Sequence, residues 1–563
     1  MSSLLSRAFT ACGVLGWTAT SLSIGCSSLE SGVALSDSAG VQVERETAPD
    51  DLVGVGNDQG PEPPPEEVER EASFRAPVVT GRYVWTANPE SGQVAAIDAE
   101  TLEIRAGEAG FRPTHVAAVS QGDEPPRALV INTGSNDATL LSASAEGIAT
   151  ETVPLHQGAD SLSVAPGARF VVAWTDSSKA ESLDPTDGFQ DITVLELRDG
   201  APAESTRLTV GYRPSAIAFD AAGEHAFAIT QDGISVLELQ SGNVQLSRLV
   251  SLPNRLGSQP DVSVTPDGSR ALARIAGSAS LYDIDLVSGQ SRELTLPGVI
   301  SDFDLSADGQ NAVAVIRGGL IAPPPASPDA GSPVDAGDAA APEAGAAVTS
   351  PATAVFIPIP AGLDDESLRR TVTSPNETFG SVALSPDGTR AVLFTTATPS
   401  GRVTLVSPTH APRSVDLLAP VRAVFLTADG GHALALQDPA PGSTRKGAFS
   451  VLSIDDVRAP KLVASDAPAE AVSIPPAASE RALVTVSDPA TNTFGTFLVR
   501  LPNLQVDFAS LPTRPLSSGT VPLANKAFVA QAHPEGRITF IALEDGSSRE
   551  LTGFELSSKV INQ

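Results

Sequence analysis

From residue 76 onward the chain alternates apolar and polar residues, and polar turns interrupt the alternation at intervals. Five segments align without gaps, and each contains an apolar strand, a polar turn with glycine and a second strand that begins with alanine. They are Phe219–Ile229, Val264–Arg274, Leu305–Val315, Leu384–Phe394 and Leu426–Leu436. A period of two is typical of strands with a buried face, so the pattern predicts a series of β-hairpins.

The turn glycines of these hairpins give the length of the repeat, because they lie 45, 41, 79 and 42 residues apart. They are Gly223, Gly268, Gly309, Gly388 and Gly430. Glycine adopts left-handed backbone without the steric penalty of a Cβ atom, so we expect structural turn residues here. Aspartate precedes four of them, and we expect these carboxylates to cap the turns rather than to bind metal. The aspartates are Asp267, Asp308, Asp387 and Asp429.

The spacing of 79 residues contains an insertion at residues 322–352 that is rich in proline, alanine, glycine and aspartate. Without it the spacing is 48 residues, close to the others. The insertion has four acids and no base, which favours a disordered loop. We expect this loop between the second and third strands of one repeat unit.

A third strand follows most hairpins, as at Gly233–Leu239, and a fourth follows after a polar turn, as at Ser291–Leu296. Four antiparallel strands in a repeat of this length are typical of a β-propeller blade. Units start near residues 76, 113, 160, 214, 260, 301, 379, 421, 470 and 518. Ordinary rings have four to eight blades, fewer than these ten unit starts. The sequence therefore predicts an all-β propeller of about seven to ten four-stranded antiparallel units. Three arrangements stay open: incomplete units that close the ring across the termini, one unusually large ring, or two rings.

Two stretches of the chain resemble a known family. SPDGTRAVLF is followed by GRVTLVSP between residues 385 and 408, and YVWTAN at residues 83–88 leads into GQVAAIDAETLEI. Both are similar to the YVTN family of bacterial β-propellers, and the likeness extends over residues 76–556. It implies the propeller fold and no particular activity, because the recurrent residues of such repeats are structural.

The first 26 residues have the layout of a secretory signal, with Arg7, no acid and an apolar stretch from Ala8 to Gly25. The stretch ends Ile24-Gly25-Cys26, which resembles a bacterial lipobox whose cysteine is lipidated and becomes the mature N-terminus. Ser23 departs from the family pattern, in which leucine is usual at that position. The resemblance implies an outer-membrane or periplasmic lipoprotein with Cys26 as the lipidation site. The alternative is an ordinary signal peptide that leaves a soluble secreted protein.

Residues 27–75 are predicted to be a disordered, acidic, proline-rich tether. Between residues 27 and 73, twelve acids oppose only Arg45 and Arg70, and such a segment buries too little apolar surface to fold. The whole chain has a net charge of −31. This excess of acid disfavours nucleic acid and anionic lipid headgroups as partners, so we expect membrane attachment through a lipid anchor only.

Candidate chemistry is sparse. The two cysteines lie in the first 26 residues, and the six histidines form no His-x-His or His-Glu-x-x-His pattern. No nucleophile elbow, dinucleotide-binding motif or P-loop occurs, so we name no catalytic, cofactor-binding or metal-binding residue and expect no cofactor. His225 and His432 occupy one repeat register and are best explained as variable turn residues. Asp283 and Asp285 alternate on a strand, so we expect both on a solvent face.

Together these features predict a monomeric, envelope-anchored propeller lipoprotein that binds or scaffolds a protein, peptide or glycan. An enzyme is less favoured but stays open, as a lactonase-like hydrolase or an oxidoreductase with a site at the mouth of the central channel. The acidic runs Asp364–Glu366 and Asp455–Asp456 lack the alternating oxygens of a calcium loop, so they indicate solvated surface.

Overall fold

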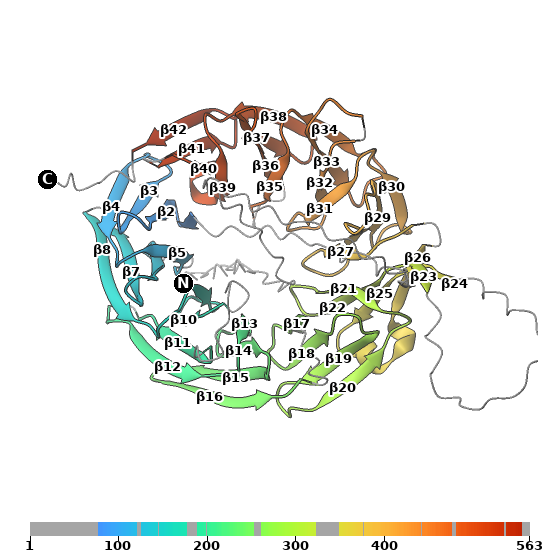
Figure 1. The fold of residues 1–563 in the computed structure, drawn as a ribbon, viewed down its shortest axis with the longest axis horizontal. Helices are drawn as coiled ribbons and strands as arrows, with labels where there is room; N and C mark the ends of the chain where they lie inside the picture. Colours follow the sequence, from blue (N-terminus) through green and yellow to red (C-terminus); the bar gives the residue numbers. More distant parts are fainter. Residues whose placement is uncertain are drawn as a thin grey trace, which may run out of the picture.

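The computed structural model describes residues 77–120, 125–144, 146–176, 189–198, 200–252, 261–321, 348–374, 377–440, 442–475, 480–533 and 536–553. The predicted signal peptide with Cys26 and the tether at 27–75 lie outside these ranges. The described chain forms ten four-stranded antiparallel sheets arranged as the blades of a single ring (Figure 1). Within each blade the first strand lies nearest the ring axis and the fourth lies at the outer rim.

The first five blades follow one another along the chain, and each uses four consecutive strands. Blade 1 has β1 (Val78–Thr80), β2 (Tyr83–Asn88), β3 (Gln93–Asp98) and β4 (Ile104–Glu108). Blade 2 has β5 (Pro113–Ala118), β6 (Arg127–Asn132), β7 (Asp137–Ser144) and β8 (Gly147–Pro154). Blade 3 has β9 (Ser161–Val164), β10 (Phe170–Trp174), β11 (Asp191–Glu196) and β12 (Glu204–Thr209). Blade 4 has β13 (Pro214–Phe219), β14 (His225–Thr230), β15 (Gly233–Gln240) and β16 (Asn243–Val250). Blade 5 has β17 (Asp261–Val264), β18 (Arg270–Arg274), β19 (Ser280–Asp285) and β20 (Ser291–Thr295).

The second half of the ring repeats the same order. Blade 6 has β21 (Ile300–Leu305), β22 (Asn311–Ile316), β25 (Ala352–Pro358) and β26 (Arg370–Ser374). Blade 7 has β27 (Ser381–Leu384), β28 (Ala391–Phe394), β29 (Arg402–Val406) and β30 (Arg413–Asp416). Blade 8 has β31 (Val421–Leu426), β32 (His432–Gln437), β33 (Gly447–Ser453) and β34 (Lys461–Ser465). Blade 9 has β35 (Ala469–Ser473), β36 (Arg481–Asp488), β37 (Thr493–Arg500) and β38 (Gln505–Ser510). Blade 10 has β39 (Pro515–Val521), β40 (Lys526–Gln531), β41 (Arg537–Ala542) and β42 (Ser548–Thr552).

The predicted four-stranded antiparallel blade is confirmed, and the ten blades begin close to the ten predicted unit starts. Of the three open arrangements, the structure has the unusually large single ring, and every blade is complete within its own stretch of sequence. The helices of the described ranges are the single turn α1 (Ala361–Asp364) and the 3₁₀ turns η1 (Glu366–Leu368) and η2 (Pro522–Ala524). None of them has the length and hydropathy of a membrane span.

The insertion lies where it was predicted, between the second and third strands of blade 6. At its base β23 (Gly319–Ile321) pairs with β24 (Val348–Ser350) in a two-stranded ribbon. The predicted end at residue 352 is therefore too late, because β24 is already ordered and β25 begins at Ala352. Residues 322–347 lie outside the described ranges.

The core is divided into layers between neighbouring blades. One such layer joins blades 4 and 5, where Phe227 and Ile229 pack near Tyr282 and Ile284. The middle strands are buried on both faces, as in β10, because every blade has a neighbour on each side. This explains why their sequences are almost continuously apolar instead of strictly alternating.

The ring closes between blade 10 and blade 1 by side-chain packing. Phe528 and Phe540 of blade 10 share a buried cluster with Val84 and Ile97 of blade 1. The ammonium group of Lys526 also donates a hydrogen bond to the Ala99 carbonyl, at 2.6 Å. Among the described residues no strand is exchanged between the two blades, since each sheet contains only its own four strands.

Candidate functional site

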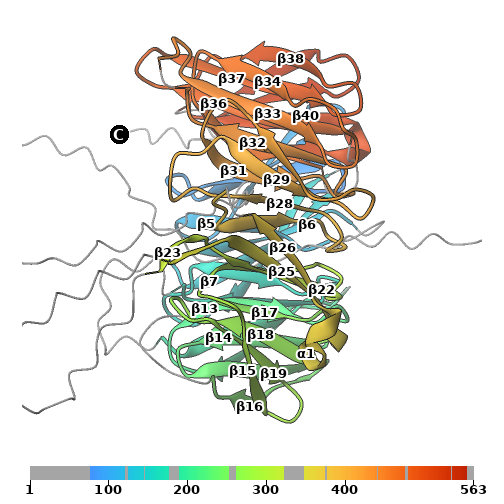
Figure 2. The ribbon, with the colours of Figure 1, turned by 90° about the vertical axis from the view of Figure 1, so that its right-hand side faces the viewer.

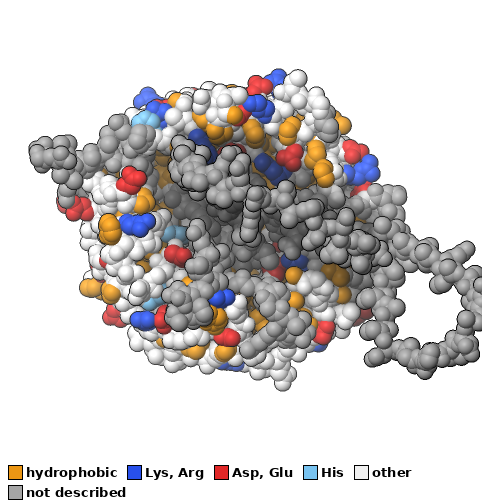
Figure 3. Space-filling view, in the orientation of Figure 1, with side chains coloured by type: hydrophobic (Ala, Val, Ile, Leu, Met, Phe, Trp, Pro, Cys, Tyr) orange, Lys and Arg blue, Asp and Glu red, His pale blue; other side chains and the backbone are white. Residues whose placement is uncertain are grey.

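The ring has two faces with different connections. We call the side with the turns between first and second strands, and between third and fourth strands, the turn face. The opposite side, with the links between blades and the loops between second and third strands, is the mouth face. Figure 2 shows α1 on the turn face and β23 on the mouth face, at opposite sides of the ring. Figure 3 views the mouth face.

A β-bulge recurs where the innermost strands begin at the mouth face. In six blades the pairing of first and second strands skips the second residue of the first strand. The skipped residues are Thr114, Ser215, Ser301, Arg422, Glu470 and Leu516. We call them the bulge ring. A bulge re-aims a side chain, and bulges are common at barrel rims and beside active sites. The bulge ring therefore places hydroxyl, cationic, anionic and apolar side chains around one mouth.

Some residues of the inner strands bind the backbone of the next blade. The Ser301 Oγ lies 2.7 Å from the Gly380 carbonyl of the following blade and 3.1 Å from Val315 O. Arg274 of blade 5 donates to the Ser301 carbonyl, and Arg422 of blade 8 donates to Ala469 O of blade 9. An innermost strand is an edge strand, whose outward N–H and C=O groups need partners. These bonds satisfy part of that edge.

Other members of the bulge ring are open to solvent. Leu516 is 65% exposed, and Thr114 is also exposed. An apolar side chain that stays exposed at the mouth adds nothing to the packing of the ring. Such positions are available for contacts with a partner.

The turn face has the opposite character, since equivalent positions in blades 5 to 8 carry the same kinds of residue and make the same bonds. In blade 7 the Ser385 hydroxyl donates to Asp387 Oδ1 at 2.6 Å and accepts from the Arg390 N–H at 3.0 Å. The same carboxylate oxygen accepts from the Thr389 N–H at 3.1 Å. Blades 5, 6 and 8 repeat this network around Asp267, Asp308 and Asp429. The aspartates therefore act as turn caps.

The five predicted turn glycines have φ between 65° and 69°, the left-handed region. Each also packs against the preceding blade. A Cβ on Gly309 would lie 2.4 Å from Pro266 Cδ, and one on Gly223 would lie 2.5 Å from Pro166 O. Glycine is thus required twice, by its backbone conformation and by the close approach of neighbouring turns. The sequence pattern carried only the first signal.

Burial lowers the pKa of the His432 imidazole, which lies beside the turn of blade 8. His225, in the same register, binds Asp220 through Nδ1 at 2.7 Å. His156 is buried where blade 2 leads into blade 3, with Nδ1 at 2.9 Å from the Thr193 hydroxyl, and burial lowers its pKa to about 4. Within the described part of the chain, no three His, Cys, Asp or Glu residues are grouped so as to hold a metal ion.

The prediction that Asp283 faces solvent is wrong. Asp283 is buried, and its carboxylate lies 2.9 Å from both the Arg270 and the Arg292 guanidinium groups. A buried strand position accepts a carboxylate when cations supplied by the adjacent strands neutralise it. Asp285 caps the following turn by accepting from the Val287 N–H at 2.9 Å.

The two acidic runs differ from each other. Asp364 is exposed and pairs with Arg292 at 2.6 Å, as solvated surface would. Asp455 instead joins two blades, because its carboxylate lies 2.8 Å from Arg390 of blade 7 and accepts from Ser407 at 2.6 Å. The sequence could not show this contact, since Arg390 and Asp455 are 65 residues apart.

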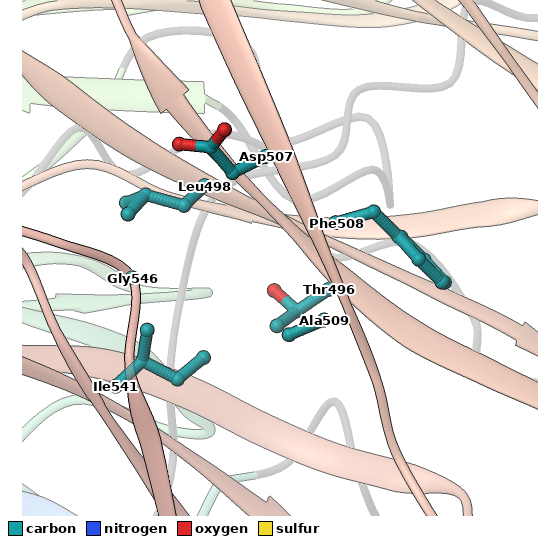
Figure 4. Close-up of a pocket in the computed structure, with 7 residues that line it drawn as sticks. All are labelled: Thr496, Leu498, Asp507, Phe508, Ala509, Ile541 and Gly546. Atoms are coloured by element: carbon teal, nitrogen blue, oxygen red, sulfur yellow. The ribbon is translucent and has the colours of Figure 1, made fainter.

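The described surface includes two hollows that bear on function. One is between blades 9 and 10, where Thr496 and Leu498 lie on the side of blade 9 that faces Ile541 (Figure 4), and its volume of about 20 Å³ is enough for a water molecule only. The other is a groove of about 470 Å³ on the mouth face of blade 7, which includes Glu377, Ser400, Arg402 and Asp416. Its volume lies within the range of ligand pockets.

Comparison with known proteins gives no family model and no curated protein that matches this chain. Among solved structures, a crystal structure of the eukaryotic initiation factor is similar with a TM-score of 0.47 and 15% identity, over 74% of this chain and 94% of that chain. The dihydro-heme d1 dehydrogenase NirN matches with a TM-score of 0.39 and 13% identity, over 70% and 74%. Apo AztD from Citrobacter koseri matches with a TM-score of 0.36 and 11% identity, over 68% and 94%. At these identities no activity is carried over, and what the structure establishes is a ten-bladed β-propeller of unassigned family.

Proposed function

We propose that this chain is an envelope-anchored propeller lipoprotein of the YVTN type, whose mouth face binds a protein, peptide or glycan. Lipidation at Cys26 would hold it at the outer membrane or in the periplasm, and residues 27–75 would let the ring reach partners away from the lipid surface. The anchor rests on the lipobox-like sequence, and the family on the repeat pattern.

The observation that carries the binding role is the contrast between equivalent positions on the two faces. The turn face repeats one hydrogen-bonded cap in four blades. The bulge ring holds hydroxyl, cationic, anionic and apolar residues at one register. Identical residues at equivalent positions serve the shared scaffold, whereas different residues on a rigid frame suit recognition of one particular partner.

A pair of photo-cross-linking variants tests the binding role in the cells that make the protein. Benzoylphenylalanine replaces Leu516 on the mouth face or Leu523 on the turn face, and both positions are in blade 10, with side chains 65% and 77% exposed. We expect a discrete adduct from position 516 and none from position 523. Equal labelling from both positions, or none from 516, would contradict a binding role of the mouth.

The anchor is tested separately with Cys26→Ala, by membrane fractionation and by the intact mass of the mature chain. We expect wild type to stay with membranes and to carry a lipid-sized mass, and the variant to lose both. A wild-type protein without added mass would refute the anchor and favour a freely secreted chain. The cross-linking result would still stand.

A further inference from the structure

The groove on the mouth face of blade 7 is a built feature rather than a chance gap between side chains. Its inner wall is the link into β27, with Glu377 and Thr378, and its outer wall is the loop from Thr398 to Gly401 between β28 and β29. The Ser400 carbonyl accepts from the Val421 N–H at 2.7 Å, and the Gly401 carbonyl accepts from Leu417 at 2.8 Å. These bonds hold the outer wall against the link to blade 8, so the groove is preformed.

Glu377 is the distinctive side chain of the groove, because it is only 8% exposed although it carries a charge. Its Oε2 accepts a hydrogen bond from the Thr404 hydroxyl at 2.5 Å. The guanidinium of Arg402 comes no closer than 4.0 Å to Oε1, beyond hydrogen-bond distance. A carboxylate removed from water gains much from a cation that can bond to it directly.

Arg402 is instead engaged by Asp416 at the opposite end of the groove. Its Nη2 lies 3.0 Å from Asp416 Oδ2, and Nε lies 3.3 Å from Oδ1. This hydrogen bond raises the pKa of Arg402 and lowers the pKa of Asp416. With two carboxylates and one guanidinium, these three side chains give the groove a net negative charge. One bidentate pair is already formed, and Glu377 is left facing the open volume.

The rest of the lining that the structure describes is rich in hydroxyls and contains no aromatic ring, since it consists of Thr378, Thr398, Ser400, Pro399 and Gly401. Hydroxyls and a carboxylate that has no cation of the described chain at hydrogen-bond distance suit a polar cation on a chain that makes backbone hydrogen bonds. Residues 27–73 and the insertion at 322–352 do not suit the groove as ligands from the chain itself, because both segments are strongly acidic. Like charges would oppose such docking.

We propose that this groove binds a basic side chain of a partner polypeptide, with Glu377 as the acceptor of its guanidinium or ammonium group. The groove lies on the mouth face of blade 7, apart from the bulge ring. The site therefore rests on the proposed binding role of that face and names a partner chemistry for it, but it depends neither on the lipid anchor nor on the contacts made at Leu516. Its volume accommodates one long side chain and the adjacent peptide backbone. The guanidinium of arginine fits best, because its planar fork can bond to both the carboxylate and neighbouring hydroxyls.

The probe is a synthetic peptide, acetyl-Gly-Ser-Arg-Ser-Gly-amide, and its matched control carries citrulline, which has the same shape without the charge. Binding to the purified full chain is measured by isothermal titration calorimetry. We expect the arginine peptide to bind roughly tenfold more tightly than the citrulline peptide, as for a charge-assisted bond in a partly desolvated site. Equal affinities, or no binding of either peptide at millimolar concentration, would overturn the proposal.

Three variants separate the site from general effects of charge and folding. Glu377→Gln should lower the affinity for the arginine peptide roughly tenfold and leave the affinity for the citrulline peptide unchanged. Glu103→Gln makes the same charge change beside Arg105 on the turn face, and should leave both peptides unchanged. Arg402→Met removes the cation 4.0 Å from Glu377 and should therefore raise the affinity for the arginine peptide. A misfolded variant could not show higher affinity. If Glu103→Gln lost as much affinity for the arginine peptide as Glu377→Gln, the loss would be a long-range effect of charge, and the site would be refuted.

Discussion

The turn face and the mouth face of the ring are built from the same ten blades, yet their equivalent positions are used differently. On the turn face, a hydroxyl, an aspartate and a glycine recur at one register, bonded in the same way in blades 5 to 8. On the mouth face, the recurring feature is the backbone bulge, while the side chain at that bulge changes from blade to blade. Positions that repeat the same residues therefore serve the structural scaffold. Positions that repeat only the backbone geometry, with different residues, are free to differ for recognition of a partner.

The turn face should be the most sensitive to small substitutions. Gly309→Ala adds a Cβ that would lie 2.4 Å from Pro266 Cδ and also strains a residue at φ 69°. We expect a loss of roughly 3 kcal/mol in the free energy of unfolding, measured by chemical denaturation. Gly242→Ala is the matched control, because it has the same φ and no atom within 4 Å of the added Cβ, so it should lose only about 1 kcal/mol. Equal losses would mean that contact between neighbouring turns contributes nothing.

The second prediction concerns pH and the ion pairs of the turn face. The hydrogen bond from Arg198, helped by Ser241, the Gly242 N–H and Arg169, lowers the pKa of Glu196 to about 2 against the opposing effect of burial. Because the pKa of Glu196 is lower in the folded protein than in the unfolded chain, its carboxylate stabilises the fold above pH 4.5. This stabilisation is lost as the pH falls toward 2. At neutral pH, the free energy of unfolding of wild type should exceed that of Glu196→Gln by about 2 kcal/mol.

Thermal unfolding of both proteins between pH 7 and pH 2 gives the measurement. The difference in Tm between wild type and Glu196→Gln should shrink steadily as the pH falls below 4.5. A constant difference across this range would show that the carboxylate charge has no role in joining blades 3 and 4. The shape of the glutamine side chain would then account for the loss.

The third and smallest effect separates two members of the bulge ring. Ser301→Ala removes a hydroxyl that lies within hydrogen-bond distance of two carbonyls, so we expect a loss of about 1 kcal/mol. Leu516→Ser changes an exposed side chain and should alter stability by less than about 0.5 kcal/mol. Chemical denaturation of both variants tests this difference. If Leu516→Ser were the more damaging, the view of the mouth as free surface would fail.

Much of the fold could be predicted because it depends on sequence patterns that extend over only a few residues. The starts of the blades, the turn glycines and the place of the insertion follow from alternation and turn residues, each of which acts within a few neighbouring positions. In blade 10 the turn lacks Asp-Gly, and Asn525 supplies the left-handed residue instead, with φ 48°. That unit could still be placed, because its strands keep the pattern.

The candidate site was far less accessible from the sequence. The bulge ring has no residue signature, since threonine, serine, arginine, glutamate and leucine all occupy it. The groove in blade 7 joins residues from an inter-blade link, a loop and two strands. Asp283 was placed on the wrong surface because alternation alone cannot distinguish a solvent face from a face covered by the next blade.

The sequence by itself determined the repeat and the four-stranded blade, because each depends on residues close together in the chain. The tertiary structure decided the number of blades in one ring, the way it closes and the partners of the buried charges. These depend on how far each blade turns relative to the next, and that angle is set by side-chain packing in the layers between blades. Packing of this kind joins residues tens to hundreds of positions apart, as in the closure between Lys526 and Ala99.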